Sequence, residues 1–278
     1  MVERSSWSKE VKTLGGLKSA TRTDPLFVLM HVQPEPNSSL TALADTVNEA
    51  FLEPMSTFMP LGPVSTADAR YSSSPSVSEY RVLKKLSVLI PAKSSGPDMI
   101  PFWLSEENAD LLAPAVTDII NCSFGEARLP QSWKHADIVP ISKQMPVYDV
   151  NKHLRPISLT PVLSKVAEES VVEQQVKPWK KMDPGLFGTI PGSSTTEALI
   201  SMTHAWYSAT DGNGATVRAV LFDFKKAFDL IDHGILVQKL RLFNIPEAVI
   251  LWITDFLSCR KQRVKLGQEV FQSGVTSR

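Results

Sequence analysis

The sequence has few cysteines, no excess of either charge and no zinc-site spacing, and each absence excludes a class of protein. Its two cysteines, Cys122 and Cys259, lie far apart, so a disulfide framework is excluded and a reducing compartment is indicated. The five histidines include no pair at the spacing that zinc sites use. Lys and Arg together number 29, as do Asp and Glu, so no overall basic field indicates binding to nucleic acid.

Leader and membrane signals are also missing. The charged first residues are followed by no apolar stretch, so no signal peptide is predicted. The longest early apolar run, Leu26 to Met30, is too short to cross a bilayer. The sequence also contains no Walker loop, nucleophile elbow or metalloprotease helix. It therefore predicts a soluble intracellular protein, in the cytoplasm or nucleus, with no membrane partner.

Helix and strand signals are mixed irregularly along the chain, which predicts an α+β fold. Residues 1–80 are rich in proline and predict a loosely structured N-terminal extension, either a linker or a segment that docks on the rest of the chain. One helix is expected there, from Ser39 or Thr41 to Leu52. The other expected helices lie around 82–86, at about 110–124, 160–177 and 194–209, around 235–243, and from Pro246 onward.

Caps and prolines locate several of these helix ends. Thr160-Pro161 predicts a helix start, and Ser194 with Glu197 forms a capping box. Pro114 is acceptable only in the first turn of its helix. The helix behind the capping box is expected to bury Leu199, Met202 and Trp206.

Strand signals are shorter. The apolar run Ala219–Phe222, behind a turn at 211–214, predicts a strand buried inside a sheet. Ile138–Ile141 predicts an edge strand, because Pro140 interrupts it. The alternating segment Arg263–Phe271 contains Gly267 and predicts a hairpin.

The stretch Phe222-Asp223-Phe224-Lys225-Lys226-Ala227-Phe228-Asp229 is the most informative feature of the chain. If the preceding run is a buried strand, Asp223 emerges from the sheet on a rigid support. An oxygen ligand held in this way suits Mg²⁺ facing incoming phosphates. The structural alternative is that Asp223 is a solvated turn residue and that Phe228 belongs to the core.

Four cations near the C-terminal end form a second candidate site. Arg260, Lys261, Arg263 and Lys265 could follow a nucleic-acid backbone. The solvated face of a hairpin explains the same pattern equally well. The pattern of charges alone leaves both interpretations open.

Several segments in a fixed order carry a resemblance to a known family. They are Gly96–Pro101, Leu129–Ile141, Leu154–Thr160, Gly192–Thr196, the stretch around Asp223 with Asp232-His233, and Arg263-Val264. This succession resembles the reverse transcriptases of non-LTR (LINE-type, jockey-like) retrotransposons, over about residues 80–278. The segment Ser6–Lys12 resembles, more weakly, the extension that precedes such domains.

The resemblance implies a partial right-hand polymerase, with fingers and an incomplete palm at 81–278, no thumb, and an extension at 1–80. Asp223 and the backbone carbonyl of Phe224 would hold Mg²⁺. Arg155 would grip the triphosphate, with Lys143 as a second contact. Phe228 would be the aromatic gate against a ribose 2′-OH. The implied partners are an RNA template, a DNA primer and deoxynucleoside triphosphates.

The sequence departs from the family pattern in three places. Residues 188–194 lack the arginines of the corresponding family segment, and Thr276–Arg278 breaks the loop begun at Ser273. No aromatic-x-Asp-Asp motif occurs, so the further catalytic aspartates are missing. The hypothesis is thus a truncated fragment of a retrotransposon RNA-directed DNA polymerase, inactive by itself, with Asp229 in a structural or capping role. The alternatives are a non-catalytic nucleic-acid-binding remnant and a chain that forms no stable protein.

Overall fold

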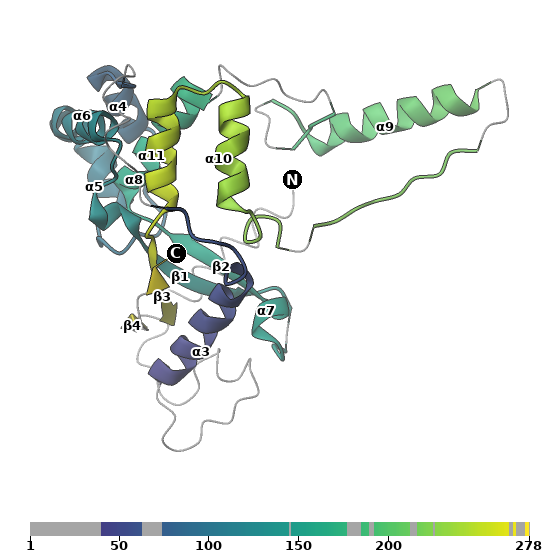
Figure 1. Cartoon of the computed structure of the whole chain (residues 1–278), viewed down its shortest axis with the longest axis horizontal. Helices are drawn as coiled ribbons and strands as arrows, with labels where there is room; N and C mark the ends of the chain where they lie inside the picture. The colour runs from purple at the N-terminus through teal and green to yellow at the C-terminus, as the bar shows by residue number, and fades with distance from the viewer. Residues whose placement is uncertain are drawn as a thin grey trace.

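The computed structural model describes residues 40–62, 74–144, 146–176, 185–188, 192–211, 216–224, 226–266, 269–270 and 276–277. Helices and one small sheet mix without strict alternation, so the predicted α+β class is confirmed (Figure 1). The helical elements of the described residues are α3 (Leu40–Leu52), η1 (Glu53–Met55), α4 (Glu79–Ser87), α5 (Phe102–Glu107), α6 (Ala109–Glu126), η3 (Gln131–Lys134), α7 (Val150–His153), α8 (Val162–Val171), η4 (Val172–Val176), α9 (Thr195–Thr210), α10 (His233–Leu242) and α11 (Glu247–Leu257).

The sheet has the strand order β2-β1-β3-β4, with β5 paired to β3. Its strands are β1 (His135–Ser142), β2 (Leu154–Leu159), β3 (Lys261–Leu266), β4 (Glu269–Val270) and β5 (Thr276–Ser277). β1 runs antiparallel to β2 and parallel to β3. β3 and β4 form an antiparallel pair, which confirms the hairpin predicted after Arg263.

The prediction that Pro140 marks an edge strand is wrong, because β1 lies between β2 and β3. Pro140 faces Pro156 in the β1–β2 ladder, while β3 pairs only with His135–Ile138. The backbone of Lys143 donates to the carbonyl of His153 at 2.7 Å, and this bond sets which positions of the ladder are hydrogen-bonded. Pro140 therefore occupies a non-hydrogen-bonded position, and its missing N–H is not needed on either side.

Helix α3 confirms the helix predicted to end at Leu52, and it packs on the sheet (Figure 1). Leu43, Ala44, Val47 and Phe51 form a buried cluster with residues of β1, β2 and β3. Asn48 is buried as well, and its Oδ1 accepts a hydrogen bond of 2.9 Å from Gln262 of β3. This part of the N-terminal extension thus packs against the sheet, while the domain boundary at residue 80 stays a prediction.

A second core joins α4, α6, α8, η3, α10 and α11. Its buried members include Val166, Ala167 and Val171 of α8, and Val249 and Ile250 of α11. The sequence did not single out Trp252, which is buried in this core and donates to Ser123 Oγ at 2.9 Å.

Two close contacts fix the segments Gly96–Pro101 and Leu129–Ile141, which carry part of the family resemblance. Gly96 lies against the backbone where α8 begins, and a Cβ built on it would stand 2.6 Å from Pro161 N and from Thr160 C. Lys134, at the end of η3, is buried and forms an ion pair of 2.9 Å with Asp255 of α11. The first contact fixes the start of α8 next to β2, and the second fixes the start of β1.

Two helices differ from expectation. α6 begins at Ala109, so Pro114 lies inside the helix rather than in its first turn. In the helix interior its missing N–H removes one backbone hydrogen bond.

The capping box of Ser194 and Glu197 is confirmed at the start of α9. None of the 16 residues of α9, all of them described, is buried, so the expected burial of Leu199, Met202 and Trp206 is wrong. Figure 1 shows α9 extending away from the other helices.

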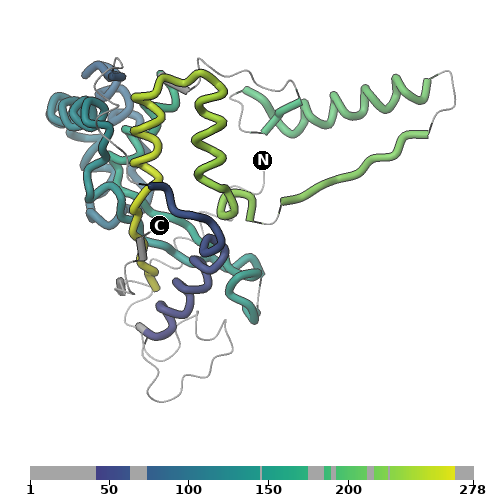
Figure 2. Tube along the Cα trace, viewed as in Figure 1, coloured from purple at the N-terminus to yellow at the C-terminus, as the bar shows by residue number. Residues whose placement is uncertain are grey.

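The expected buried strand at Ala219–Phe222 is also wrong. Residues 216–224 carry no strand and run as an extended segment from α9 back toward α10 (Figure 2). Leu221 is 89% exposed and Phe222 is 87% exposed. The turn predicted at 211–214 lies mostly outside the described residues. Among the helices that the structure describes, none has the length and apolar character needed to cross a membrane.

Candidate functional site

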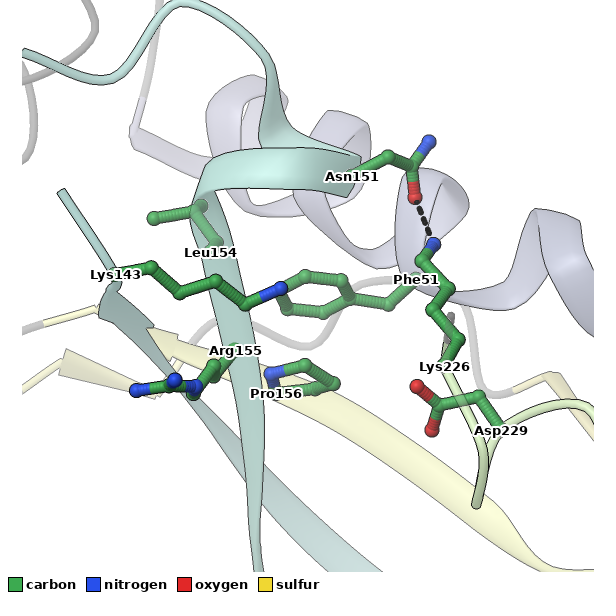
Figure 3. A pocket seen from close by; sticks show the side chains of 8 residues that line it. All are labelled: Phe51, Lys143, Asn151, Leu154, Arg155, Pro156, Lys226 and Asp229. Atoms are coloured by element: carbon green, nitrogen blue, oxygen red, sulfur yellow. Dashed lines mark hydrogen bonds between the residues drawn. The ribbon is translucent and has the colours of Figure 1, made fainter. Parts of the chain in front are cut away.

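A cavity of about 170 Å³ lies where α3, α7, β2 and the turn at 226–230 meet (Figure 3). It brings together residues from three distant parts of the chain. The lining residues are Phe51, Lys143, Asn151, Leu154, Arg155, Pro156, Lys226 and Asp229.

Lys143 and Arg155 reach this cavity through the β1–β2 ladder. Arg155 pairs with Ile141, and Lys143 follows two residues further along, bonded to His153. Side chains at such diagonal positions of an antiparallel pair lie on the same face. The sheet therefore brings together the two cations that the sequence analysis assigned to a triphosphate.

The opposite side of the cavity is a tight turn. The backbone N–H groups of Asp229 and Leu230 donate to the carbonyl of Lys226 at 3.0 and 3.1 Å. Lys226 itself has a φ of 52°, a left-handed conformation that costs a residue with a Cβ about 1–2 kcal/mol. This turn directs both Lys226 and Asp229 toward the cavity, as Figure 3 shows.

Asn151 links that turn to the N-terminal extension. Lys226 Nζ donates to Asn151 Oδ1 at 2.8 Å, and Asn151 Nδ2 donates to Glu53 Oε2 at 2.9 Å. Asn151 lies in α7, whose N-cap Asp149 accepts from the backbone of Lys152. The side-chain hydrogen bond from Lys152 lowers the pKa of Asp149, so this cap is charged at neutral pH.

The charges of the cavity favour an anion. Three cationic side chains and one carboxylate line it, so its formal charge is positive. Phe51 and Leu154 are buried and form its apolar part. Cations on two sides of a cavity that also has an apolar lining can bind phosphate oxygens. The planar guanidinium of Arg155 can bind two phosphate oxygens at once.

The predicted metal ligand lies elsewhere. Asp223 and Phe224 are exposed on the extended segment, and neither lines the cavity. Phe228 is 86% exposed, so it belongs neither to the core nor to this cavity. Among the described residues, no group of three or more His, Cys, Asp or Glu side chains could hold a metal ion. The rigid support expected for Asp223 is missing because its segment pairs with none of the described strands.

The four cations proposed to follow nucleic acid are not equivalent. Arg263 donates to the buried Asp137 at 2.6 Å, so its charge is used to bind β3 to β1. Arg260 lies 4.6 Å from the ring centroid of Phe256 and donates to its carbonyl at 3.1 Å. Lys261 and Lys265 lie on β3 with Arg263 between them, so the patch is weaker than the sequence suggests.

Sequence reasoning missed three contributors to the cavity, namely Phe51, Asn151 and Lys226. Phe51 lies in the helix expected to end at Leu52, which was given no role in a site, and Asn151 carried no motif signal. Lys226 stood inside the motif of Asp223 without a role. Asp229 was expected to be structural; its backbone closes the turn, and its side chain also lines the cavity.

Comparison with known proteins agrees with the motifs. Residues 141–277 match the family model described as reverse transcriptase (RNA-dependent DNA polymerase). Over 191 residues the chain is 29% identical to the RNA-directed DNA polymerase from mobile element jockey of Drosophila melanogaster, which covers 66% of this chain and 20% of that protein. Over 141 residues it is 30% identical to the probable RNA-directed DNA polymerase from transposon BS of the same organism, covering 49% of this chain and 15% of that protein.

The predicted resemblance to non-LTR retrotransposon reverse transcriptases is thereby confirmed. The chain spans only 20% and 15% of the length of these two relatives. The matched region begins at the end of β1 and contains Lys143, Arg155, Lys226 and Asp229. Phe51 and Glu53 precede it.

Proposed function

We propose that this chain supplies the nucleotide-binding part of a retrotransposon reverse transcriptase, and that its cavity holds the triphosphate of an incoming deoxynucleoside triphosphate. The observation that carries the proposal is the meeting of Lys143 and Arg155 in one cavity. Sequence motifs assigned both residues to the triphosphate, and the β1–β2 ladder sets them on one face. The similarity to RNA-directed DNA polymerases supports the same role.

The side chains divide the work according to their chemistry. The guanidinium of Arg155 offers a planar pair of donors for two phosphate oxygens, and the ammonium of Lys143 adds a compact charge beside it. Arg155 lies in β2, and Lys143 directly follows β1 and donates its backbone N–H to His153. Both backbone positions are therefore fixed before the ligand arrives, which lowers the ordering cost of binding. Phe51 and Pro156 present apolar surface near these cations.

The described residues do not complete a metal site. Asp223 lies on an exposed segment, and the carboxylate of Asp229 has no second acidic group beside it in the cavity lining. A single carboxylate holds Mg²⁺ poorly against its hydration. The family generally uses divalent ions, and the assignment of Asp223 and Phe224 as Mg²⁺ ligands stays a prediction. No step through the metal follows from this arrangement.

The larger architecture is proposed on the same basis. The β1–β2 pair with its helices corresponds to the fingers, and the segment around Asp223 to an incomplete palm. An RNA template and a DNA primer are the partners that a reverse transcriptase implies. The rival interpretation, a non-catalytic nucleic-acid-binding remnant, loses support because Arg263 is paired with Asp137.

Nucleotide binding by the whole chain tests the proposal. A fluorescent N-methylanthraniloyl deoxyadenosine triphosphate should bind saturably, and Arg155→Ala should weaken binding by about 10- to 100-fold, because a hydrogen bond to a charged group is worth about 1.5–3 kcal/mol. Arg81→Ala on α4 makes the same change of charge on an exposed residue outside the cavity. Equal affinities for the two variants, or no saturable binding to the wild-type chain, would overturn the proposal.

A further inference from the structure

The cavity has a wall and a hydrogen-bonded link that come from the N-terminal extension, ahead of the segment that matches the polymerase family. Phe51, near the end of α3, is buried and lines the cavity. Glu53, two residues later in η1, binds Asn151, which in turn binds Lys226. The family match starts only at residue 141.

We propose that Lys226 is a third phosphate-binding cation, and that Glu53 and Asn151 are positioning residues that hold it toward the cavity. This inference rests on the proposed nucleotide site. If Glu53 holds Lys226 in this way, the segment of α3 and η1 contributes to nucleotide binding in addition to packing on the sheet.

The amide of Asn151 is suited to this task because it uses both of its ends. Its nitrogen donates to the carboxylate of Glu53, and its oxygen accepts from the ammonium of Lys226. Only one orientation of the amide satisfies both partners, so Glu53 fixes which atom faces Lys226. A carboxylate at position 151 would also hold the lysine, but it would cancel the charge that an anion needs. The neutral amide orients the cation without adding a negative charge beside it.

The backbone of the turn supports the same conclusion. Lys226 adopts its left-handed φ of 52° in the turn that also presents Asp229. Strained conformations of residues with a Cβ persist where surrounding contacts hold them, and they gather at binding sites. The hydrogen bond to Asn151 is such a contact. Figure 3 shows Lys226 directed at Asn151, across the cavity from Lys143 and Arg155.

Helix α3 can hold Glu53 in place because the helix is anchored to the sheet by contacts that do not involve Glu53 or Asn151. Its buried face belongs to the cluster formed with β1, β2 and β3. A separate hydrogen bond of 2.9 Å joins Asn48 of the same helix to Gln262 of β3. Glu53 is exposed, so replacing it removes the link without opening the core.

A double-mutant cycle tests the inference, with the same fluorescent nucleotide and the whole chain. Glu53→Ala is expected to weaken binding about 3- to 10-fold, since the link amounts to one hydrogen bond. Lys226→Ala is expected to weaken it more, and adding Glu53→Ala to Lys226→Ala should have no further effect. Glu53→Gln keeps an acceptor for Asn151 and should bind as the wild-type chain does.

Asn48→Ala is the matched control, because it breaks a polar contact between α3 and the sheet that lies outside the cavity. It is expected to lower the unfolding midpoint in urea and to leave nucleotide affinity unchanged. The positioning role is refuted if Glu53→Ala has no effect, if it is additive with Lys226→Ala, or if Asn48→Ala weakens binding equally. In each case a loss of binding in Arg155→Ala would still support the nucleotide site, so the two proposals fail separately.

Discussion

The ion pair between Lys134 and Asp255 gives the sharpest test of how the site is supported. Lys134 ends η3 and immediately precedes β1, the strand that leads to Lys143. Its side chain is 3% exposed and that of Asp255 is 17% exposed. Asp255 also accepts a hydrogen bond of 2.7 Å from the backbone of Leu129, so one carboxylate serves two buried donors. We predict that Asp255→Ala strongly destabilises the fold.

The size of the effect depends on the groups that each change leaves behind. Asp255→Ala leaves a buried ammonium without a partner and the Leu129 N–H unpaired. Losing one partner of a buried pair typically costs about 3–5 kcal/mol, and the partial exposure of Asp255 places this case near the lower value. Lys134→Met removes the buried charge and leaves a partly hydrated carboxylate that still binds Leu129, so we expect about half that cost.

Urea unfolding followed by tryptophan fluorescence measures both changes, because Trp133 and Trp252 lie in the same core. The double variant Lys134→Met with Asp255→Ala should be more stable than Asp255→Ala alone, since it contains no unpaired buried charge. If Asp255→Ala costs no more than Lys134→Met, the interpretation of the pair as a buried support is refuted.

Two further predictions concern the segment around Gly96. Gly96→Ala should lower the free energy of unfolding by at least about 1–3 kcal/mol, measured in thermal or urea unfolding, because its Cβ would meet the backbone of Thr160 and Pro161. Gly125→Ala is the control and should be neutral or mildly stabilising, because no atom lies within 4 Å of the added Cβ. Equal effects of the two changes would contradict the close contact at Gly96. Burial raises the pKa of Asp98 above 3.8, so the folded chain binds the proton more tightly than the unfolded chain and loses stability as pH rises through that raised pKa. The stability of Asp98→Asn should therefore match that of the wild-type chain near pH 3 and exceed it by pH 6. Urea unfolding midpoints at the two pH values measure this difference. If the carboxyl were fully solvated, the midpoints of the two proteins would not diverge.

Local sequence patterns predicted where helices begin better than they predicted which side chains are buried. The capping box at Ser194 and the proline starts at Pro161 and Pro246 set helix beginnings within a residue or two, because a cap is a short-range feature. The burial expected for Leu199 and Met202 failed, because an apolar face shows that a helix can be buried and does not supply the partner. The position of β1 inside the sheet depends on β3, more than a hundred residues away, which no local pattern reveals.

The candidate site shows the same division. Lys143 and Arg155 were assigned together from family motifs, and the ladder between β1 and β2 sets them on one face. Phe51, Asn151 and Lys226 were missed, because their role depends on three segments meeting in space. Nothing in the spacing of these residues indicates the hydrogen bond from Lys226 to Asn151.

The two halves of the proposed active site therefore differ in how they are held. The phosphate-binding half is built on the sheet and on a hydrogen-bonded turn, so its cations are positioned in advance. The metal-binding half rests on Asp223, in a segment whose neighbours Leu221 and Phe222 are exposed and which pairs with none of the described strands. Burying a large apolar side chain is worth about 1.5–3 kcal/mol, so this segment would be stabilised by any surface that covered it. A metal ligand must be fixed to within about half an ångström to be useful, and an uncovered extended segment does not provide that precision. Nucleotide affinity should consequently depend on Arg155 and Lys226 and be insensitive to Asp223→Asn, whereas dependence on Asp223 would show that the segment adopts a held position in solution.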